Sequence, residues 1–226
     1  MTHNIIITDV LSAFTIQPIT TSEASPLRYF LDEEHDAGVQ SLLLFGRLLG
    51  YEELVALCGG DVGATELTVG ISNTGLYLEY RHFSSDCVGA CLIRRTEDMR
   101  LTLVNEHVRF LRRNGIERKK FHWFSRQKVA CESLGITAIH VTGARTTIAQ
   151  GYYYYPLFGF NASLPAEFAR FLTQDFADCQ TVLDLYEHPQ GRKSWALYGC
   201  PCEMVFEQEG ISNSSQHVYD QYLKQI

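Results

Sequence analysis

Residues 101–143 read LTLVNEHVRFLRRNGIERKKFHWFSRQKVACESLGITAIHVTG, and this stretch decides the fold class. Leu101–Val108 has the pattern of a strand, and Ile136–Val141 is a second, short apolar strand. Between them, apolar residues recur at helical spacing and stop at Gly135, a residue type that commonly ends helices. The apolar stripe of this helix is Phe121, Phe124, Cys131 and Leu134. Because a helical crossover connects the two strands, we expect them to be parallel.

The segment before this stretch carries the alternation of a β-meander. Apolar and polar residues alternate over Leu67–Ile71 and again over Leu76–Tyr80, with the turn signal Asn73-Thr74-Gly75 between them. Val88–Ile93 adds a third strand. Strands that follow one another so closely usually pair antiparallel. We therefore predict an α+β fold with a mixed, mostly antiparallel sheet and flanking helices.

We predict one domain over residues 1–226, because no repeat or linker interrupts the chain. Residues 1–60 are expected to form an N-terminal arm and helices, residues 61–165 the core, and residues 166–226 C-terminal helices and a strand. The C-terminal elements that we expect are a helix at Pro165–Thr173, a strand at Glu203–Phe206 and a terminal helix around Val218–Lys224.

The composition excludes several classes of protein. The chain has 226 residues, of which 46% are hydrophobic, and a formal net charge of −7. These values argue against a disordered chain and against a protein that coats nucleic acid or acidic membrane with its whole surface. No run approaches the ~18 apolar residues of a membrane span, and no clear signal peptide begins the sequence. The seven cysteines, an odd number without metal-ligand spacing, fit reduced thiols, so we expect a cytoplasmic protein with neither a metal nor a membrane partner.

The charge is concentrated in one segment. Residues 109–128 carry eight Lys or Arg side chains and one acid, Glu117, a sum of +7 that leaves −14 for all other residues. Within this segment, loop 112–120 lies where a strand passes into a helix, and the unpaired amides of a helix N-terminus attract anions. Such a run is either a solvated basic face or a site for a polyanion such as a pyrophosphate-containing cofactor. Its position favours the second interpretation.

Four consecutive tyrosines, Tyr152–Tyr155, lie in the segment GYYYYPLFGF of residues 151–160. They cannot all be buried on one face of a regular element, so some must face a cleft or solvent. A tyrosine cluster usually serves packing, with a hydrogen bond at its rim. The spacing Tyr155-x-x-x-Gly159-Phe160 shortly after an apolar strand indicates a more specific motif.

The order of meander, basic loop, helix, Leu134-Gly135-Ile136 and strand resembles the GNAT (Gcn5-related N-acetyltransferase) superfamily. A run that is similar to a little-characterised GNAT-like subgroup follows: Ala144-Arg145, Gly151-Tyr152-Tyr153, Pro156 and Gly159-Phe160. The resemblance covers about residues 65–165 and is faint beyond them. It implies an acyl-CoA-binding core within residues 61–165, where strands 101–110 and 136–142 splay apart at the cofactor site.

The resemblance also implies which residues bind acetyl-CoA or another acyl-CoA. They are the strand end, the loop and the helix start: Val108, Phe110, Leu111, Arg112, Arg113, Asn114, Gly115, Ile116, Arg118, Lys119 and Lys120. The family's loop motif is Arg/Gln-x-x-Gly-x-Gly/Ala, and its amides hold the pyrophosphate. This chain lacks the second glycine, because Glu117 stands there when Arg112-x-x-Gly115 is aligned with the motif. Cationic side chains can replace some of the amide contacts, whereas a bulky residue hinders close approach of the backbone.

Acyl transfer from a thioester to an amine needs a base for the amine, a donor for the oxyanion and an acid for the thiolate. The resemblance assigns the acid to Tyr155 and the oxyanion donor to a backbone amide near Val108–Leu111. The candidate bases are Glu106 and His107, which in a regular strand point to opposite faces. The neighbouring strand offers two further candidates, Glu79 and His82.

We therefore predict an acyl-CoA-dependent N-acyltransferase that acylates a primary amine of a small molecule, a peptide or a protein lysine. The acidic remainder of the chain favours a cationic acceptor. One alternative is a GNAT-fold binding or regulatory module without catalysis. Another is a domain that binds single-stranded nucleic acid beside Phe121–Phe124, which the helical burial of Phe121 and Phe124 and the acidic net charge disfavour. Homodimerisation stays open.

Overall fold

The structure, a computed structural model, describes residues 44–61, 65–72, 75–83, 86–111, 116–144, 151–169, 176, 178–208 and 213–224. The chain divides into two compact units, of which the first ends at Gly135 and the second begins at Ile136. The fold is α+β with mostly antiparallel strands, as the sequence predicts. The expected parallel pair takes one strand from each unit and stays a prediction. Residues 1–43, most of the expected N-terminal segment, lie outside the described residues.

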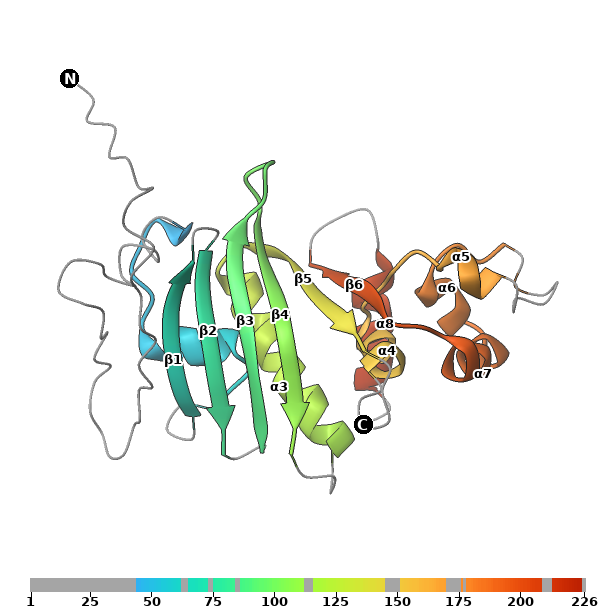
Figure 1. The fold of residues 1–226 in the computed structure, drawn as a ribbon, viewed down its shortest axis with the longest axis horizontal. Coiled ribbons are helices and arrows are strands. Elements are labelled where there is room, and N and C mark those ends of the chain that lie inside the picture. The colour runs from blue at the N-terminus through green and yellow to red at the C-terminus, as the bar shows by residue number, and fades with distance from the viewer. Residues whose placement is uncertain are drawn as a thin grey trace. The chain divides into compact units, whose positions relative to one another are not determined.

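The first unit contains an antiparallel meander of four strands, which confirms that prediction (Figure 1). The strands are β1 (Thr65–Ser72), β2 (Gly75–His82), β3 (Cys87–Arg95) and β4 (Leu101–Phe110). In β2, Leu78 and Tyr80 are buried, whereas Glu79 between them is exposed. This alternation follows from the two-residue period of a strand and gives the sheet a buried face and a second face.

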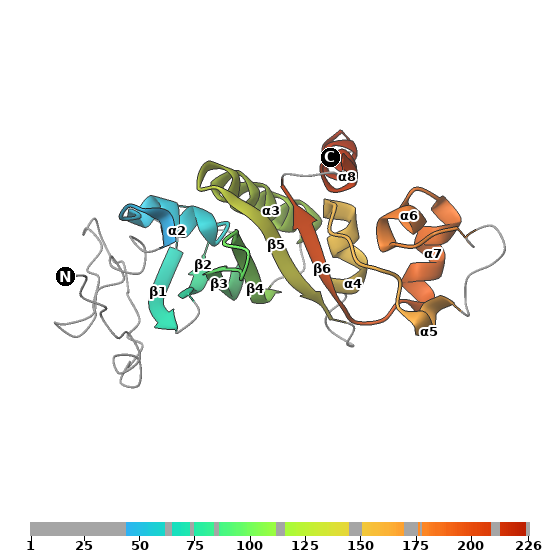
Figure 2. The same ribbon diagram turned by 90° about the horizontal axis from the view of Figure 1, so that it is seen from above.

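Two helices cover the buried face of this sheet. They are α2 (Tyr51–Leu57) and α3 (Ile116–Ser133), and both lie on the same side of the four strands (Figure 2). Within the described part of the first unit, no helix lies on the other side. We call the side opposite α2 and α3 the open face.

The apolar stripe predicted for α3 is largely confirmed. Phe121, Phe124 and Cys131 are buried, and Leu134 is half-buried. Gly135 adopts a φ of +70°, and its amide donates to the carbonyl of Glu132 at the end of the helix. This is the left-handed C-terminal stop that the sequence predicts.

Polar side chains satisfy the last carbonyls of α2. Trp123 Nε1 and His82 Nε2 both donate to the carbonyl of Cys58, at 2.9 and 2.8 Å. Gln127 Nε2 donates to the carbonyl of Leu57 at 2.8 Å. Because the last carbonyls of a helix have no partner within it, these three bonds fix the end of α2 against α3 and β2.

The second unit consists of a strand pair and short helices. Its strands β5 (Ile136–Gly143) and β6 (Cys202–Glu207) pair antiparallel. The helices are α4 (Gly151–Tyr154), the 3-10 helix η2 (Tyr155–Phe158), α5 (Ala166–Ala169), α6 (Val182–Tyr186), α7 (Pro189–Tyr198) and α8 (Asn213–Leu223). The predicted C-terminal strand and helix are confirmed. Of the helix predicted at 165–173, residues 166–169 form α5, and 170–173 lie outside the described residues.

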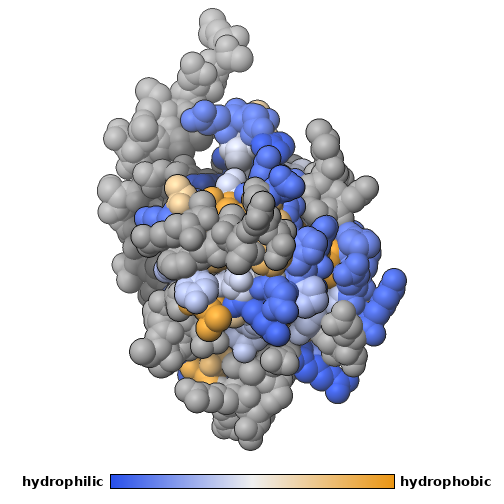
Figure 3. Space-filling view, turned by 90° about the vertical axis from the view of Figure 1, so that its right-hand side faces the viewer, coloured by the Kyte–Doolittle hydropathy of each residue, from blue (hydrophilic) through white to orange (hydrophobic). Residues whose placement is uncertain are grey.

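The tyrosine run forms a helical turn in the second unit. Tyr152 is buried, donates its hydroxyl to the carbonyl of Ala196 at 2.7 Å, and accepts from Trp195 Nε1 at its own carbonyl. Tyr153–Tyr155 are half-buried, in line with the expectation that the four rings cannot share one buried face. The side of the molecule shown in Figure 3 is mainly hydrophilic where it is described, with separate small hydrophobic areas.

The seven cysteine thiols are free. Cys58, Cys87, Cys91 and Cys131 are buried in the first unit, and the other three are partly exposed. Burial raises the pKa of Cys87 to about 12 and that of Cys202 to about 11. Both thiols are therefore protonated, and weak nucleophiles, at neutral pH.

We expect the free energy of unfolding to fall as the pH drops from about 6.5 to about 4. Burial lowers the pKa of His82 from 6.5 to about 4. In this range the unfolded chain binds a proton at His82 and the folded chain does not, which costs about 3 kcal/mol of stability at the acidic end. Urea unfolding at several pH values measures the loss, which His82→Gln should abolish. An NMR titration of the folded protein in which His82 titrates near 6.5 would contradict the prediction.

We expect Gly159→Ala to destabilise the protein more than Gly135→Ala. Both glycines have a positive φ, +92° and +70°, so both substitutions carry a backbone cost of about 1 kcal/mol. A Cβ at Gly159 would also lie 2.1 Å from the carbonyl oxygen of Ser215, whereas nothing lies within 4 Å at Gly135. This overlap adds about 1–3 kcal/mol. Denaturant unfolding compares the variants. Equal losses in the free energy of unfolding would show that the close approach of Gly159 to Ser215 does not contribute.

Candidate functional site

The predicted anion loop, residues 112–120, follows the end of β4 at Phe110, but α3 begins at Ile116, so residues 116–120 are helical and the loop is shorter than predicted. Leu111 is 48% exposed, and Arg112–Gly115 lie outside the described residues. The predicted passage from a strand into a helix is therefore confirmed on both sides of the loop. The loop's own role in binding a cofactor stays a prediction.

The cations in the first turns of α3 have different surroundings. Lys119 Nζ lies 3.3 Å from Asp86 Oδ2, and both side chains are partly exposed. Arg118 is exposed, and its Nε donates to His122 Nε2 at 3.3 Å. Lys120 is half-buried. Lys119 is tied by this ion pair to a residue that precedes β3, which makes Asp86 an anchor for this turn of α3.

Asp86 lies in the turn between β2 and β3, in a left-handed conformation with a φ of 52°. Its carbonyl accepts a hydrogen bond of 2.7 Å from the amide of Leu111. Together with the contact to Lys119, this bond attaches the β2–β3 turn to both ends of the predicted anion loop. Aspartate tolerates the left-handed region better than most residues, because its short side chain bonds locally.

A β-bulge interrupts β4 at the candidate bases. Ala90 of β3 pairs with His107, and the next residue, Cys91, pairs with Asn105, so Glu106 is an extra residue without a partner. Side chains on both sides of the bulge confirm the shift. Asn105 bonds to Gln127 of α3 and Phe110 contacts Trp123 of α3, although residues five positions apart lie on opposite faces of a regular strand.

The bulge corrects the expectation that Glu106 and His107 point to opposite faces. In a regular strand only one of them would lie on the open face, but the extra residue turns both to it. Both side chains are exposed. The two candidate bases therefore lie next to each other on the same surface.

Two residues of β2 extend this cluster on the open face. Glu79 pairs with Ala90, which pairs in turn with His107, so the three residues form one row across the strands. Burial raises the pKa of Tyr77, and the charges of Glu79 and Glu106 raise it further, so both carboxylates lie within electrostatic reach of this phenol. Such a cluster attracts a cation and offers a histidine to accept its proton.

His82, which the sequence offers as a further base, serves the core instead. It is 1% exposed, and its Nδ1 lies 2.8 Å from Thr65 Oγ1, opposite the bond to Cys58. It lies on the buried face with Leu78 and Tyr80. A substrate on the open face cannot reach it.

The remaining predicted residues are placed in different units. Val108 is half-buried in β4 of the first unit. Tyr155 is half-buried in η2 of the second unit, and its ring centroid lies 5.4 Å from that of Phe160. The role of Tyr155 as the acid stays a prediction.

The aromatic side chains beside the basic segment are unsuited to stacking on bases. Phe121, Trp123 and Phe124 are at most 4% exposed. Since bases stack on exposed rings, these residues do not support the alternative of a single-strand binding surface.

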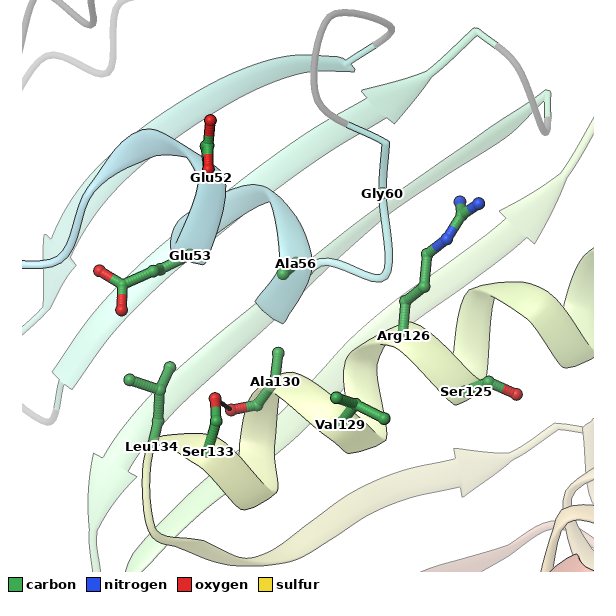
Figure 4. A pocket seen from close by; sticks show the side chains of 10 residues that line it. All are labelled: Glu52, Glu53, Ala56, Gly60, Ser125, Arg126, Val129, Ala130, Ser133 and Leu134. Carbon is green, nitrogen blue, oxygen red and sulfur yellow. Dashed lines mark hydrogen bonds between the residues drawn. The ribbon is translucent and has the colours of Figure 1, made fainter.

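A groove of about 510 Å³ lies between α2 and α3 (Figure 4). Ala56, Val129 and Leu134 contribute apolar surface to it, and its lining includes none of the predicted site residues. Two of its charged side chains are already paired. Arg126 bonds to Asp61 at 2.7 Å, and Glu53 bonds to Arg47.

Within the described residues, no three His, Cys, Asp or Glu side chains form a group that could hold a metal ion. The described helices also include none with the length and apolar character needed to cross a membrane. In comparisons with known proteins, the sequence matches no protein-family model, and no curated protein matches it.

The sequence did not identify Tyr77 and Asp86 as part of this region. A signal for Asp86 exists, because the run Ser84-Ser85-Asp86 between two strands is typical of a turn. Tyr77 alternates with apolar residues in the hairpin, but this pattern alone says nothing about a neighbouring carboxylate on β4.

We expect Asp86→Ala to destabilise the protein by about 1–2 kcal/mol and Asp86→Asn by less than about 1 kcal/mol. Both variants lose the charge opposite Lys119, but asparagine retains the tolerance for a positive φ. Denaturant unfolding measures both. Met99→Ala, at a φ of 66° in an exposed turn, controls for the backbone conformation. Equal losses for alanine and asparagine would show that the left-handed conformation contributes nothing.

Proposed function

We propose that this protein is an acyl-CoA-dependent N-acyltransferase that transfers an acetyl or longer acyl group to a primary amine. The observation that carries the proposal is the β-bulge in β4. It places Glu106 and His107 together on the open face, on the strand that leads into the cationic start of α3. The candidate base and the cations proposed to bind the phosphates thus lie on one strand and on the helix that follows it.

The anionic end of acyl-CoA suits the start of α3. Phosphates are held by unpaired amides and by cationic side chains, and Arg118, Lys119 and Lys120 supply three cations in the first turns. The sequence continues this charge with Arg112 and Arg113. The cations support phosphate binding although the second glycine of the family's loop motif is missing.

The open face suits the acceptor. A primary amine is largely protonated at neutral pH, so it is attracted to a carboxylate and must lose a proton before it attacks. Glu79 and Glu106 supply the carboxylates, and His107 is the residue that we assign to accept the proton. The resemblance assigns protonation of the leaving thiolate to Tyr155, which we include in the proposal.

We expect thiol release from acetyl-CoA in the presence of amines, and we expect His107→Gln to lower kcat roughly hundredfold. Glu106→Gln should raise the KM for the amine about tenfold, because it removes one attractive charge. A thiol-release assay with a polyamine, a lysine peptide and an amino sugar measures these constants. His217→Gln and Glu167→Gln, which change exposed residues of the second unit, are matched controls.

The same assay separates the alternatives. Binding of CoA without turnover on any amine would favour a catalytically inactive binding module. Absence of both binding and turnover would reject the proposal. Equal activity of the wild type and His107→Gln would show that another residue is the base.

A further inference from the structure

The turn between β2 and β3 lies beside the predicted anion loop. Cys87 pairs with His82 on one side and with Phe110 on the other, so the ends of β2, β3 and β4 lie in one row. The bond between the Asp86 carbonyl and the Leu111 amide continues this row beyond the last strand pairs. Asp86, at the end of the turn, is therefore held against Leu111, the residue that precedes the predicted loop.

This end of the sheet presents an aromatic ring and two guanidinium groups. Phe83 is 51% exposed, and the guanidinium carbon of Arg81 lies 5.2 Å from the centroid of its ring. Arg81 pairs with Val88, which pairs with Arg109 of β4, so the two arginines occupy one row of the sheet. Both arginines are exposed. Because Arg81 alternates with buried residues, it projects from the open face.

On β2 and β4 the charge on the open face changes sign along the strands, and on β1 Glu66 lies opposite Arg81. Arg81 and Arg109 occupy the end near the turn, whereas Glu79, Glu106 and His107 lie further from it along the same two strands. A ligand with a negative and a positive end would therefore bind this face in one direction. An exposed ring at the cationic end suits a flat group that carries phosphates.

We propose that Phe83, Arg81 and Arg109 form a subsite for a phosphorylated nucleoside, with the base on the Phe83 ring and the phosphates toward the arginines. The proposal rests on the proposed function, in which this ligand is the nucleoside bisphosphate end of acyl-CoA. The spacing fits, because two strand separations, about 10 Å, lie between the Phe83 side of the turn and the end of β4. This distance is comparable to the length of a nucleoside diphosphate.

The physical basis is stacking combined with charge. Every base presents a π-face to an aromatic ring, and guanidinium groups favour both phosphates and ring faces. Phe83 remains half exposed although Arg81 lies over its ring, so part of its surface is accessible to a ligand. The Asp86–Lys119 contact holds the turn close to the cations of α3.

Calorimetric titration with CoA, adenosine 3′,5′-bisphosphate and inorganic pyrophosphate tests the subsite. We expect Phe83→Ala to weaken the binding of the two nucleotides roughly five- to hundredfold and to leave pyrophosphate binding unchanged. Phe83→Tyr, which keeps the ring, should remain within about twofold of the wild type. Met99→Ala, which truncates another exposed side chain in a turn, is the control.

Each other outcome overturns the subsite. If Phe83→Ala leaves nucleotide binding unaffected, the ring of Phe83 is not part of the site. Equal weakening of nucleotide and pyrophosphate binding shows a general structural effect, and a wild type that binds neither nucleotide at millimolar concentration has no such site. The thiol-release assay reports separately on the proposed function. Turnover with an unaffected Phe83→Ala variant rejects the subsite alone, and Phe83-dependent binding without turnover rejects catalysis alone.

Discussion

The carbonyl oxygen of Cys58 accepts hydrogen bonds from Trp123 Nε1 and His82 Nε2, at 2.9 and 2.8 Å, where α2 ends. One buried atom thus joins α2, α3 and β2, and losing a partner of a buried carbonyl costs about 1–3 kcal/mol. The position of the His82 ring also requires a glycine at position 60, because a Cβ there would lie 2.2 Å from Cε1 of His82. Both helices are fixed against one face of the meander, and no described helix of the first unit lies on the opposite face, where Glu79, Glu106 and His107 are exposed.

Two irregular features of the backbone determine which side chains lie together on the open face and at its end. The bulge at Glu106 brings two consecutive polar side chains to the same surface, which a regular strand would separate. Asp86, in a left-handed conformation, attaches the β2–β3 turn to the amide of Leu111 and to Lys119. The regular elements supply the frame, and these two departures from regularity decide which side chains lie together.

Much of the frame could be predicted because its signals are local: the alternation of the meander, the stripe of α3 and the stop at Gly135. The bulge also left a signal, since apolar residues shift from odd positions, Leu101 and Leu103, to even positions, Val108 and Phe110.

His82 shares the spacing of the buried residues of β2, but its partners, Thr65 and Cys58, come from distant segments. The start of the short helix α6 depends on a local cap, the Thr181 and Asp184 pair, and α7 begins at Pro189 without a side-chain cap. The cluster of Glu79, Glu106 and His107 needed the cross-strand register, which no single segment encodes.

The chain is acidic overall, yet residues 109–128 carry a compact group of cations. The strand register shows at which end of the open face Arg109, the first of these cations, lies. Arg109 is two residues from His107 on β4, about 7 Å along the strand, and Arg81 is two residues from Glu79 on β2. Phosphates placed beside Glu79 and Glu106 would meet like charges, whereas beside Arg109 they meet an opposite charge, and Arg81 shares its end of the face with Glu66 of β1. For the proposed reaction, this order admits one orientation, with the nucleotide toward Phe83 and the amine toward His107. The thioester and the amine would then meet on β4, between the arginines that hold the acyl-CoA and the glutamates that attract the amine.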